Sequence, residues 1–239
     1  MHHTLTIIIP CFNEQQFISG VLDKVLRSQL PGDIQKEVIV VDDYSSDGSV
    51  MAIESYLSDN PGAAVTLVKH SKNQGKGASI HSGIARSTGD MIIIQDADYE
   101  YDPAEYGKLL RPILDGHADV VYGSRFRGSE AHRVLFFLHS AGNKMLTTLS
   151  NLFTGMNLTD METGYKLFNG PMLRSLKLKE KRFGFEPEVT ARIARISGIR
   201  VYEVGISYYG RSYAEGKKIG WKDGVRALYC IIKYNIFSR

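Results

Sequence analysis

Three carboxylates follow directly on an apolar run near the middle of the chain. Residues 92–94 are isoleucines, which suits a strand buried on both faces, and Asp96, Asp98 and Glu100 come just after them. In open α/β sheets, ligands bind at the carboxyl ends of the strands. If the strand breaks into a turn at Ala97, two of these carboxylates can converge on a magnesium-like cation that substrate phosphates also bind. A polar loop of solvated acids is the alternative, and this segment alone does not decide between them.

Acidic residues also follow the first two predicted strands. Glu14 comes after the end of the first strand and Asp43 ends the second, so both would lie at an edge where a nucleotide could bind. Carboxylates there can accept hydrogen bonds from a base N–H group or from ribose hydroxyls. Helix capping is the competing explanation. It suits Asp47 but accounts poorly for Glu14 and Asp43.

The glycine-rich segment 73–79 invites comparison with a phosphate-binding loop. A P-loop carries Ser or Thr directly after its Gly-Lys pair, whereas Gly77 and Ala78 follow the pair here. The first strand is not followed by the glycine pattern of dinucleotide-binding proteins, which disfavours an oxidoreductase. Glycines that open a helix remain compatible with close approach of a sugar or phosphate, and equally with a plain turn.

Four basic residues are candidates for binding phosphate groups. Arg125 ends the fifth predicted strand in a Gly-Ser-Arg sequence, and Arg133 follows after a short polar loop. Arg211 and Lys217 lie in a glycine-rich, basic segment near the C-terminus. Forked guanidinium donors match the oxygens of a phosphate group. For any one of the four, a solvated surface position is the alternative.

Strand-like and helix-like segments alternate along the first half of the chain. Apolar runs predict strands at 5–10, 37–43, 64–70, 90–98 and 118–125, with helices at 15–29, 48–59, 76–88 and 103–116. The second half predicts helices at 132–153, 188–197 and 221–237, strands at 164–168 and 199–208, and a turn at Gly170-Pro171. Continuous apolar strands alternating with helices indicate an α/β fold with a mostly parallel sheet covered on both faces. We expect one domain over 1–239, with a nucleotide-binding half at 1–130 and an acceptor-binding half at 131–239.

The bulk composition excludes several classes of protein. The 239 residues carry 29 basic and 26 acidic side chains, and a net charge of +3 gives no reason to expect nucleic acid as a partner. The two cysteines have no metal-type spacing, and no apolar run reaches the length of a membrane span. We therefore expect a cytoplasmic protein without a signal peptide or a membrane-spanning helix.

Four motifs taken in order closely resemble glycosyltransferase family 2, the inverting enzymes of the GT-A fold. They are Pro-x-Phe-x-Glu at 10–14, Val-Asp-Asp at 41–43, Asp-Ala-Asp-x-Glu at 96–100 and Gly-Ser-Arg at 123–125. Residues 160–168 and 211–217 look like the dolichyl- and polyprenyl-phosphate sugar transferase branch, which is dolichol-phosphate mannosyltransferase-like. This resemblance covers nearly the whole chain, and the ordered set is far more specific than any single motif.

The resemblance implies roles for individual residues. Those that would bind the donor nucleotide are Pro10, Phe12, Glu14, Val41, Asp43 and Ala97. Asp96 and Asp98 would bind Mg²⁺ or Mn²⁺ on the donor diphosphate, with Glu100 as a further ligand where the family often has Gln. Arg125 would serve the acceptor or donor phosphate, Arg133 the acceptor phosphate, and Arg211 with Lys217 the diphosphate. Tyr44 departs from the family, which usually has Gly there, and this puts the local turn in doubt.

The implied reaction transfers a hexose from a GDP- or UDP-sugar to a polyprenyl phosphate, with inversion. A phosphate monoester has a second pKa of roughly 6, so it is largely ionised at neutral pH and needs no general base. A sugar hydroxyl of a cell-envelope glycan or glycolipid is the main alternative acceptor. It would need a base, for which Asp160 or Glu186 is the candidate. The processive Gln-x-x-Arg-Trp signature is absent, and a non-catalytic nucleotide-sugar-binding protein stays open.

A lipid acceptor also implies contact with a membrane surface. One helical stripe contains Trp221, Val225, Leu228, Ile232 and Ile236, with basic residues elsewhere around the helix. This amphipathic C-terminal helix is typical of a segment lying in the headgroup region, and equally of a helix packed on a core. Residues 136–138 are a second candidate contact. We therefore expect peripheral association with the cytoplasmic face of a membrane.

Overall fold

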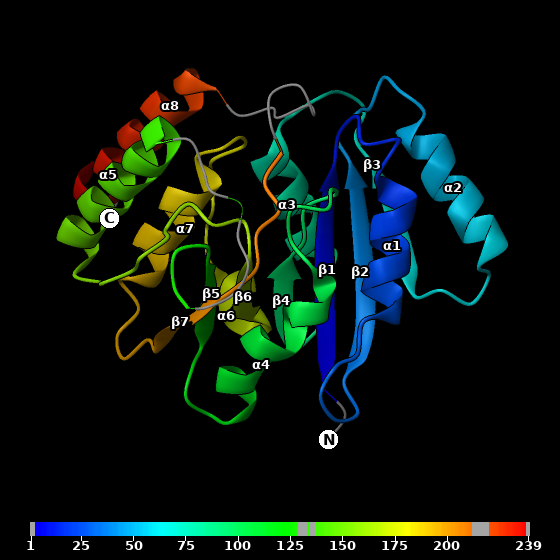
Figure 1. Ribbon diagram of the computed structural model, residues 1–239, viewed down its shortest axis with the longest axis horizontal. Coiled ribbons are helices and arrows are strands. Elements are labelled where there is room, and N and C mark those ends of the chain that lie inside the picture. The colour runs from blue at the N-terminus through cyan, green and yellow to red at the C-terminus, as the bar shows by residue number, and fades with distance from the viewer. Residues whose placement is uncertain (1–2, 129–132, 134–136, 212–219, 238–239) are drawn as a thin grey trace.

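The computed structural model describes residues 3–128, 133, 137–211 and 220–237, without the side chains of residues 138, 139 and 221 (Figure 1). Its centre is a sheet of seven strands in the order β3-β2-β1-β4-β6-β5-β7. The strands are β1 Thr4–Cys11, β2 Gln35–Asp42, β3 Val65–Lys69, β4 Met91–Ile94, β5 Val120–Ser124, β6 Lys166–Asn169 and β7 Val201–Gly205. The predicted α/β fold with a mostly parallel sheet is confirmed.

Strand β6 is the exception to the parallel arrangement. It lies between β4 and β5 and runs antiparallel to both, whereas β1, β2, β3, β4, β5 and β7 all point the same way. The carboxyl ends of β1, β2, β4 and β5 therefore meet at one edge of the sheet. Since β6 and β7 come from the second half of the sequence, a single sheet includes strands of both halves.

Helices cover both faces of the sheet (Figure 1). They are α1 Ile18–Arg27, α2 Ser49–Asp59, α3 Lys76–Arg86, η1 Pro103–Glu105, α4 Tyr106–Leu114, α5 Phe137–Thr154, α6 Gly170–Ser175, α7 Phe185–Ile193, α8 Trp221–Ile232 and the π-helical turn η3 Lys233–Phe237. Ile7 and Ile9 of β1 pack in the apolar core under α1, α2 and α4. Ile8 points to the opposite core, under α3, α5, α7 and α8. The continuous apolar run of β1 thus serves two cores.

Several predicted elements were wrong in detail. The turn expected at Gly170-Pro171 is the start of α6, because the Asn169 side chain caps it by accepting a 3.0 Å hydrogen bond from the Met172 N–H group, with proline in the first turn. Helix α7 begins at Phe185, earlier than the predicted 188, because Pro187 is tolerated in a first helical turn. The predicted strand at 90–98 ends at Ile94, which leaves its carboxylates in a loop.

Candidate active site

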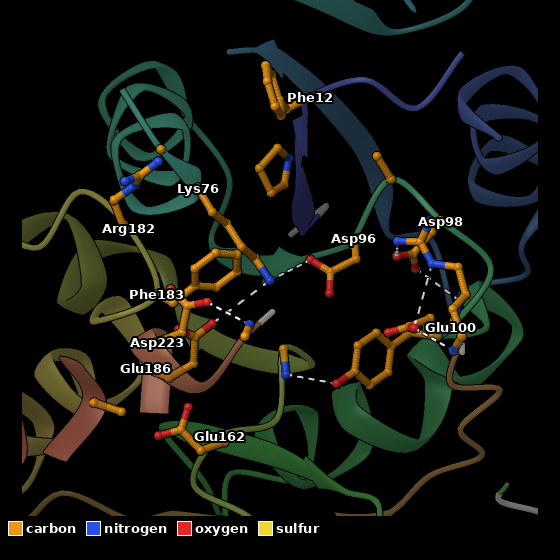
Figure 2. A pocket seen from close by; sticks show the side chains of 18 of the residues that line it. Phe12, Lys76, Asp96, Asp98, Glu100, Glu162, Arg182, Phe183, Glu186 and Asp223 are labelled. Atoms are coloured by element: carbon orange, nitrogen blue, oxygen red, sulfur yellow. Dashed lines mark hydrogen bonds and ion pairs between the residues drawn. The ribbon is translucent and has the colours of Figure 1, made fainter. Parts of the chain in front are cut away.

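A cavity of about 720 Å³ lies at the edge of the sheet where β1, β2, β4 and β5 end (Figure 2). Of the residues predicted from the sequence, eleven line it: Pro10, Phe12, Glu14, Asp43, Asp96, Ala97, Asp98, Glu100, Arg125, Glu186 and Arg211. Further wall residues come from α3, α5, α8, the segment before α7 and the loops that contain Glu162 and Tyr208. The structure thus brings together most of the residues chosen from six separate segments of the sequence.

The turns after β1 and β2, at this edge of the sheet, each contain a residue with an unusual backbone conformation. Asn13 has φ 51° and Tyr44 has φ 64°, both in the left-handed region that favours glycine. Asn13 and Ser46 join the two turns, since the Asn13 Oδ1 accepts a 2.8 Å hydrogen bond from the Ser46 N–H group. Tyr44 therefore adopts the conformation that a glycine would adopt more easily, and the turn is formed despite the departure noted in the sequence.

The carboxylate of Asp43 is occupied by protein groups. It accepts hydrogen bonds from the N–H groups of Gln74 at 2.8 Å and Gly75 at 2.6 Å, and its Oδ1 lies 2.8 Å from His70 Nδ1. Asp43 is buried while still lining the cavity. It fixes the loop that opens α3 at the cavity wall, so its contact with a nucleotide stays a prediction.

Lys76, the first residue of α3, is a cavity cation that the sequence did not single out. Its Nζ lies 2.7 Å from Asp96 Oδ1 and 4.0 Å from Glu186 Oε1. Dashed lines in Figure 2 mark the ion pairs of Lys76. Burial alone would lower the pKa of Lys76, but Asp96 and Glu186 raise it above its ordinary value. The sequence signal for Lys76 is its place between Gly75 and Gly77. Because that segment does not match a P-loop, Lys76 was not predicted as a site residue.

Arg211 joins the carboxylates that follow β1 and β4. Its guanidinium lies 3.2 Å from Glu14 Oε2 and 2.5 Å from Asp98 Oδ2, and its backbone N–H donates to Glu100 at 2.7 Å. The Tyr208 hydroxyl donates to the other oxygen of Glu100 at 2.9 Å. One arginine therefore links three predicted site residues from two strands.

Asp96 and Asp98 fit a divalent cation by their chemistry. Both are hard oxygen donors, and both line the cavity at the end of β4. Burial, together with the negative charges of Asp96 and Glu100, raises the pKa of Asp98 to about 7 despite the opposing Arg211, so added positive charge is favourable there. Glu100 is occupied by Tyr208 and Arg211, and the described residues contain no group of three or more His, Cys, Asp or Glu side chains arranged to hold a metal. Glu100 as a metal ligand stays a prediction.

Asp160 and Arg125 form a buried, bidentate ion pair. The Asp160 oxygens accept hydrogen bonds from Arg125 Nε and Nη2, each at 2.7 Å, and from Asn143 Nδ2 at 3.1 Å. Burial would raise the pKa of Asp160, but Arg125 and Asn143 lower it below its ordinary value. Arg125 lines the cavity and Asp160 stands behind it.

Three other predicted residues lie away from the cavity wall or outside the described structure. Val41 is fully buried against Ile39 and Val68 in a small apolar cluster. Arg133 is exposed, and its guanidinium donates a 2.6 Å hydrogen bond to the Gly210 carbonyl. Lys217 lies outside the described residues, so its role stays a prediction.

Glu162 and Glu186 also line the cavity, and Figure 2 shows both of them below Lys76. Glu186 is buried in the first turn of α7. Burial and the neighbouring Glu186 raise the pKa of Glu162 to about 8, although Lys166 opposes them. The buried Glu162 Oε1 has no hydrogen-bond partner within the described part of the chain. Glu162 was missed as a site residue, because nothing in the local sequence shows that it faces a cavity.

Helix α8 presents an apolar stripe to solvent. Val225, Tyr229 and Ile232 are exposed along it, as is Ile236 of the following η3, while Cys230 and Ile231 of α8 and Tyr234 of η3 are buried. Helix α5 lies beside α8 (Figure 1), and its side chains Phe137, Met145 and Leu152 are exposed. The predicted Leu228 is only partly exposed, because it packs on the core, and the Trp221 side chain is not described. Among the described residues, no helix combines the length and apolarity required to cross a bilayer.

The sequence model of glycosyl transferase family 2 matches residues 6–176, which include most of β1, all of β2 to β6 and most of the cavity residues. The chain belongs to this family. It is 30% identical over 224 residues to the undecaprenyl-phosphate mannosyltransferase of Micrococcus luteus, covering 89% of this chain and 86% of the other. It is 24% identical to the dodecaprenyl-phosphate galacturonate synthase of Rhizobium johnstonii over 89% of this chain, but spans only 61% of that relative's length.

A solved structure has the same architecture as this chain. The glucosyl-3-phosphoglycerate synthase from Mycobacterium tuberculosis, crystallised with Mn²⁺, UDP and glucosyl-3-phosphoglycerate, superimposes with a TM-score of 0.71. The match covers 98% of this chain and 80% of the other at 17% sequence identity. The expected GT-A fold is thereby confirmed, and at this identity the likeness extends to the fold alone.

Proposed function

We propose that this glycosyltransferase moves a sugar from a nucleotide-sugar donor to a polyprenyl phosphate, with inversion at the anomeric carbon. The single observation that carries the acceptor class is the buried Asp160–Arg125 pair, which holds a guanidinium at the cavity wall where it can receive a phosphate. The relatives from Micrococcus and Rhizobium support this choice, since their names specify undecaprenyl and dodecaprenyl phosphate.

The donor would bind across the ends of β1, β2 and β4. Pro10 and Phe12 line this side and offer apolar contact for the base, and the Glu14 carboxylate can accept from ribose hydroxyls once Arg211 moves to the diphosphate. Asp43 would act chiefly through the α3 loop that it fixes. Both GDP- and UDP-sugars suit these contacts.

Asp96 and Asp98 would hold a Mg²⁺ or Mn²⁺ ion, whose chemistry is to neutralise diphosphate oxygens. Lys76 and Arg211 now pair with these carboxylates, and they are placed to turn to the donor phosphates instead. Positive charge aimed at the leaving diphosphate stabilises the charge that develops as the sugar bond breaks. Lys217 is proposed to join Arg211 in this task.

The acceptor would present an ionised phosphate oxygen to the anomeric carbon. A bond forms between that oxygen and the carbon as the bond from the carbon to the diphosphate breaks, and the nucleoside diphosphate leaves with the electron pair. No proton has to be removed, because a phosphate monoester with a second pKa of roughly 6 is already ionised at neutral pH. Arg125 would orient this phosphate from the cavity wall, and Arg133 is proposed to assist by turning from the Gly210 carbonyl to the phosphate.

A sugar-hydroxyl acceptor is the second candidate, and Glu186 is the observation that favours it. Its carboxylate is buried, lines the cavity and lies 4.0 Å from Lys76, so it could serve as a general base. Asp160 is poorly suited to that task, since both of its oxygens accept hydrogen bonds from Arg125.

The lipid acceptor would be reached from a membrane surface. The exposed stripe of α8 carries Val225, Ile232 and Ile236, and Lys222 and Arg226 lie beside it. Apolar side chains flanked by cations suit the headgroup region of an anionic bilayer. Peripheral attachment to the cytoplasmic face is therefore part of this proposal.

A metal titration and a product assay test the proposed function. Purified protein should bind UDP or GDP in a manner that needs Mn²⁺, and Asp98→Ala should abolish this dependence while the nearby control Asp102→Ala keeps it. Unchanged nucleotide binding in Asp98→Ala would remove the metal assignment. A panel of nucleotide sugars mixed with polyprenyl phosphate should then give a lipid-linked sugar. Failure of every donor to do so, with nucleotide binding intact, would argue against the acceptor.

A further inference from the structure

Glu180 connects the C-terminal helices to a segment that forms one wall of the cavity. Its buried carboxylate accepts hydrogen bonds from Arg226 Nη2 at 2.6 Å, Lys233 Nζ at 3.0 Å and the Tyr234 hydroxyl at 2.7 Å. Its backbone N–H donates to Glu188 Oε2 at 2.6 Å. Glu180 thus receives side chains from both α8 and η3 while α7 holds its backbone.

The residues next to Glu180 pack directly on the start of α3. The Ala78 N–H group donates a 2.9 Å hydrogen bond to the Lys181 carbonyl. A Cβ atom built on Gly77 would lie 2.3 Å from the Glu180 carbonyl oxygen, and one built on Gly75 would lie 2.5 Å from that of Lys181. Only glycines allow two backbones to approach this closely.

The same contacts border the donor side of the cavity. Gly75 and Lys76 line it from α3, and Arg182 and Phe183 line it from the segment beside them (Figure 2). Lys76 reaches Asp96 from this position. A shift of residues 180–183 would therefore move both an arginine at the wall and the turn from which Lys76 extends.

We infer that Glu180 is a positioning residue through which α8 sets the geometry of the donor side of the cavity. Its carboxylate does not line the cavity; it acts through the backbone of residues 180–182 and the first turn of α3. The inference rests on the proposed function, since it supposes that a nucleotide binds on this side. Burial opposes ionisation of Glu180, yet Arg226, Tyr234 and Lys233 lower its pKa to about 2, so the Glu180 carboxylate is charged at neutral pH.

The test weakens the contact between Glu180 and Arg226 without changing a residue that lines the cavity. Glu180→Gln and Arg226→Met should each weaken binding of UDP or GDP with Mn²⁺ by about threefold to tenfold, measured by calorimetry, since coupled positions have effects of this order. Arg226→Lys, which keeps the charge, should recover most of the affinity. The matched control is Arg200→Met. Arg200 pairs with Asp119 at 2.7 Å and is about as exposed as Arg226. This control pair lies just before the amino ends of β5 and β7.

Hydrogen exchange gives a second readout that does not depend on nucleotide. The Ala78 amide should exchange faster in Glu180→Gln and Arg226→Met than in the wild type. Its exchange rate in Arg200→Met should equal that of the wild type. Equal nucleotide affinity and equal Ala78 exchange in all four proteins would overturn the inference, as would an affinity loss no larger than that of Arg200→Met. If the wild type binds no nucleotide, the proposed function fails, and the exchange of Ala78 still decides the role of Glu180.

Discussion

The carboxylate of Asp160 accepts hydrogen bonds from Nε and Nη2 of Arg125, each at 2.7 Å, in a position with no solvent exposure. Asn143 adds a third hydrogen bond to the same carboxylate at 3.1 Å. A guanidinium on the rim of a cavity is held in one orientation when two parallel hydrogen bonds fix its plane. This pair converts Asp160 from a candidate base into the support of a candidate phosphate ligand.

Asp160→Asn should destabilise the protein severely. It leaves the buried Arg125 charge without its partner, and loss of one member of a buried pair costs about 3–5 kcal/mol in the free energy of unfolding. Urea unfolding measures this cost. The more exposed Asp119–Arg200 pair is the comparison, and Asp119→Asn should cost less than about 1 kcal/mol. Equal costs in the two variants would mean that Asp160 does not anchor a buried charge.

Turnover provides a separate test of Asp160. If Asp160 acts only through Arg125, the two residues work as one unit. The double variant Asp160→Asn, Arg125→Gln should then be about as active as the less active of the two single variants. Product formation at saturating donor measures this. Independent losses that multiply in the double variant would point to a role of Asp160 apart from Arg125.

Gly75→Ala should impair folding. Gly75 has φ +101°, and an added Cβ would lie 2.5 Å from the Lys181 carbonyl oxygen, so strain and a clash together should cost about 1–3 kcal/mol. Gly107→Ala is the control, because an added Cβ in the first turn of α4 would meet nothing within 4 Å, and alanine there should raise stability by about 0.5–1 kcal/mol. Thermal and urea unfolding give both values. A neutral Gly75→Ala would show that the 180–182 segment yields easily.

Glu162 gives the protein a specific pH dependence. Its pKa is about 8 in the folded state because of burial and Glu186, against roughly 4.3 for an exposed glutamate. A carboxyl whose pKa is raised by folding holds its proton better in the folded state. Its contribution to stability is present below about pH 4 and is lost as the pH rises toward about 8.

Glu162→Gln isolates this effect, since glutamine imitates the protonated acid at every pH. The free energy of unfolding of the variant, relative to the wild type, should therefore increase between about pH 5 and about pH 8. Urea unfolding across this interval measures it. A difference that stays constant with pH would mean that Glu162 ionises normally.

The exposed stripe of α8 should bind vesicles. Flotation with anionic liposomes should recover the wild type, and Val225→Asp with Ile232→Asp should abolish recovery by placing charge in the apolar contact. Met51→Asp on α2 is the control, because Met51 is 69% exposed at the opposite end of the molecule from α8 (Figure 1). Recovery of the double variant equal to that of the control would remove α8 as the membrane contact.

The sequence predicted the parts of the fold that have a strong local pattern. The strands β1, β2, β4 and β5 are continuous apolar runs, and the acids and arginine at their ends follow from that register. The four-residue strand β6 is too short to show periodicity, so nothing indicated that it inserts antiparallel between β4 and β5. Its position depends on long-range packing.

The contacts within the site were hidden for a similar reason. Lys76 pairs with Asp96 and Arg125 with Asp160 across long separations in sequence, and no local pattern specifies such partners. The sequence predicts that Val41 belongs to a strand, but it does not predict which face of the sheet its side chain takes. That face depends on which elements pack against the sheet. The order of the motifs therefore predicted which residues belong to the site, but not which of them contact one another.

The most direct test compares a phosphate acceptor with a hydroxyl acceptor. Labelled donor sugar, Mn²⁺ and the protein are incubated with vesicles that contain polyprenyl phosphate or the matching polyprenol, and the extracted lipid is assayed for label. Transfer by base-free attack predicts label in the polyprenyl phosphate product alone, with Glu186→Gln retaining substantial turnover. Label on the polyprenol, with none on polyprenyl phosphate, would contradict this account.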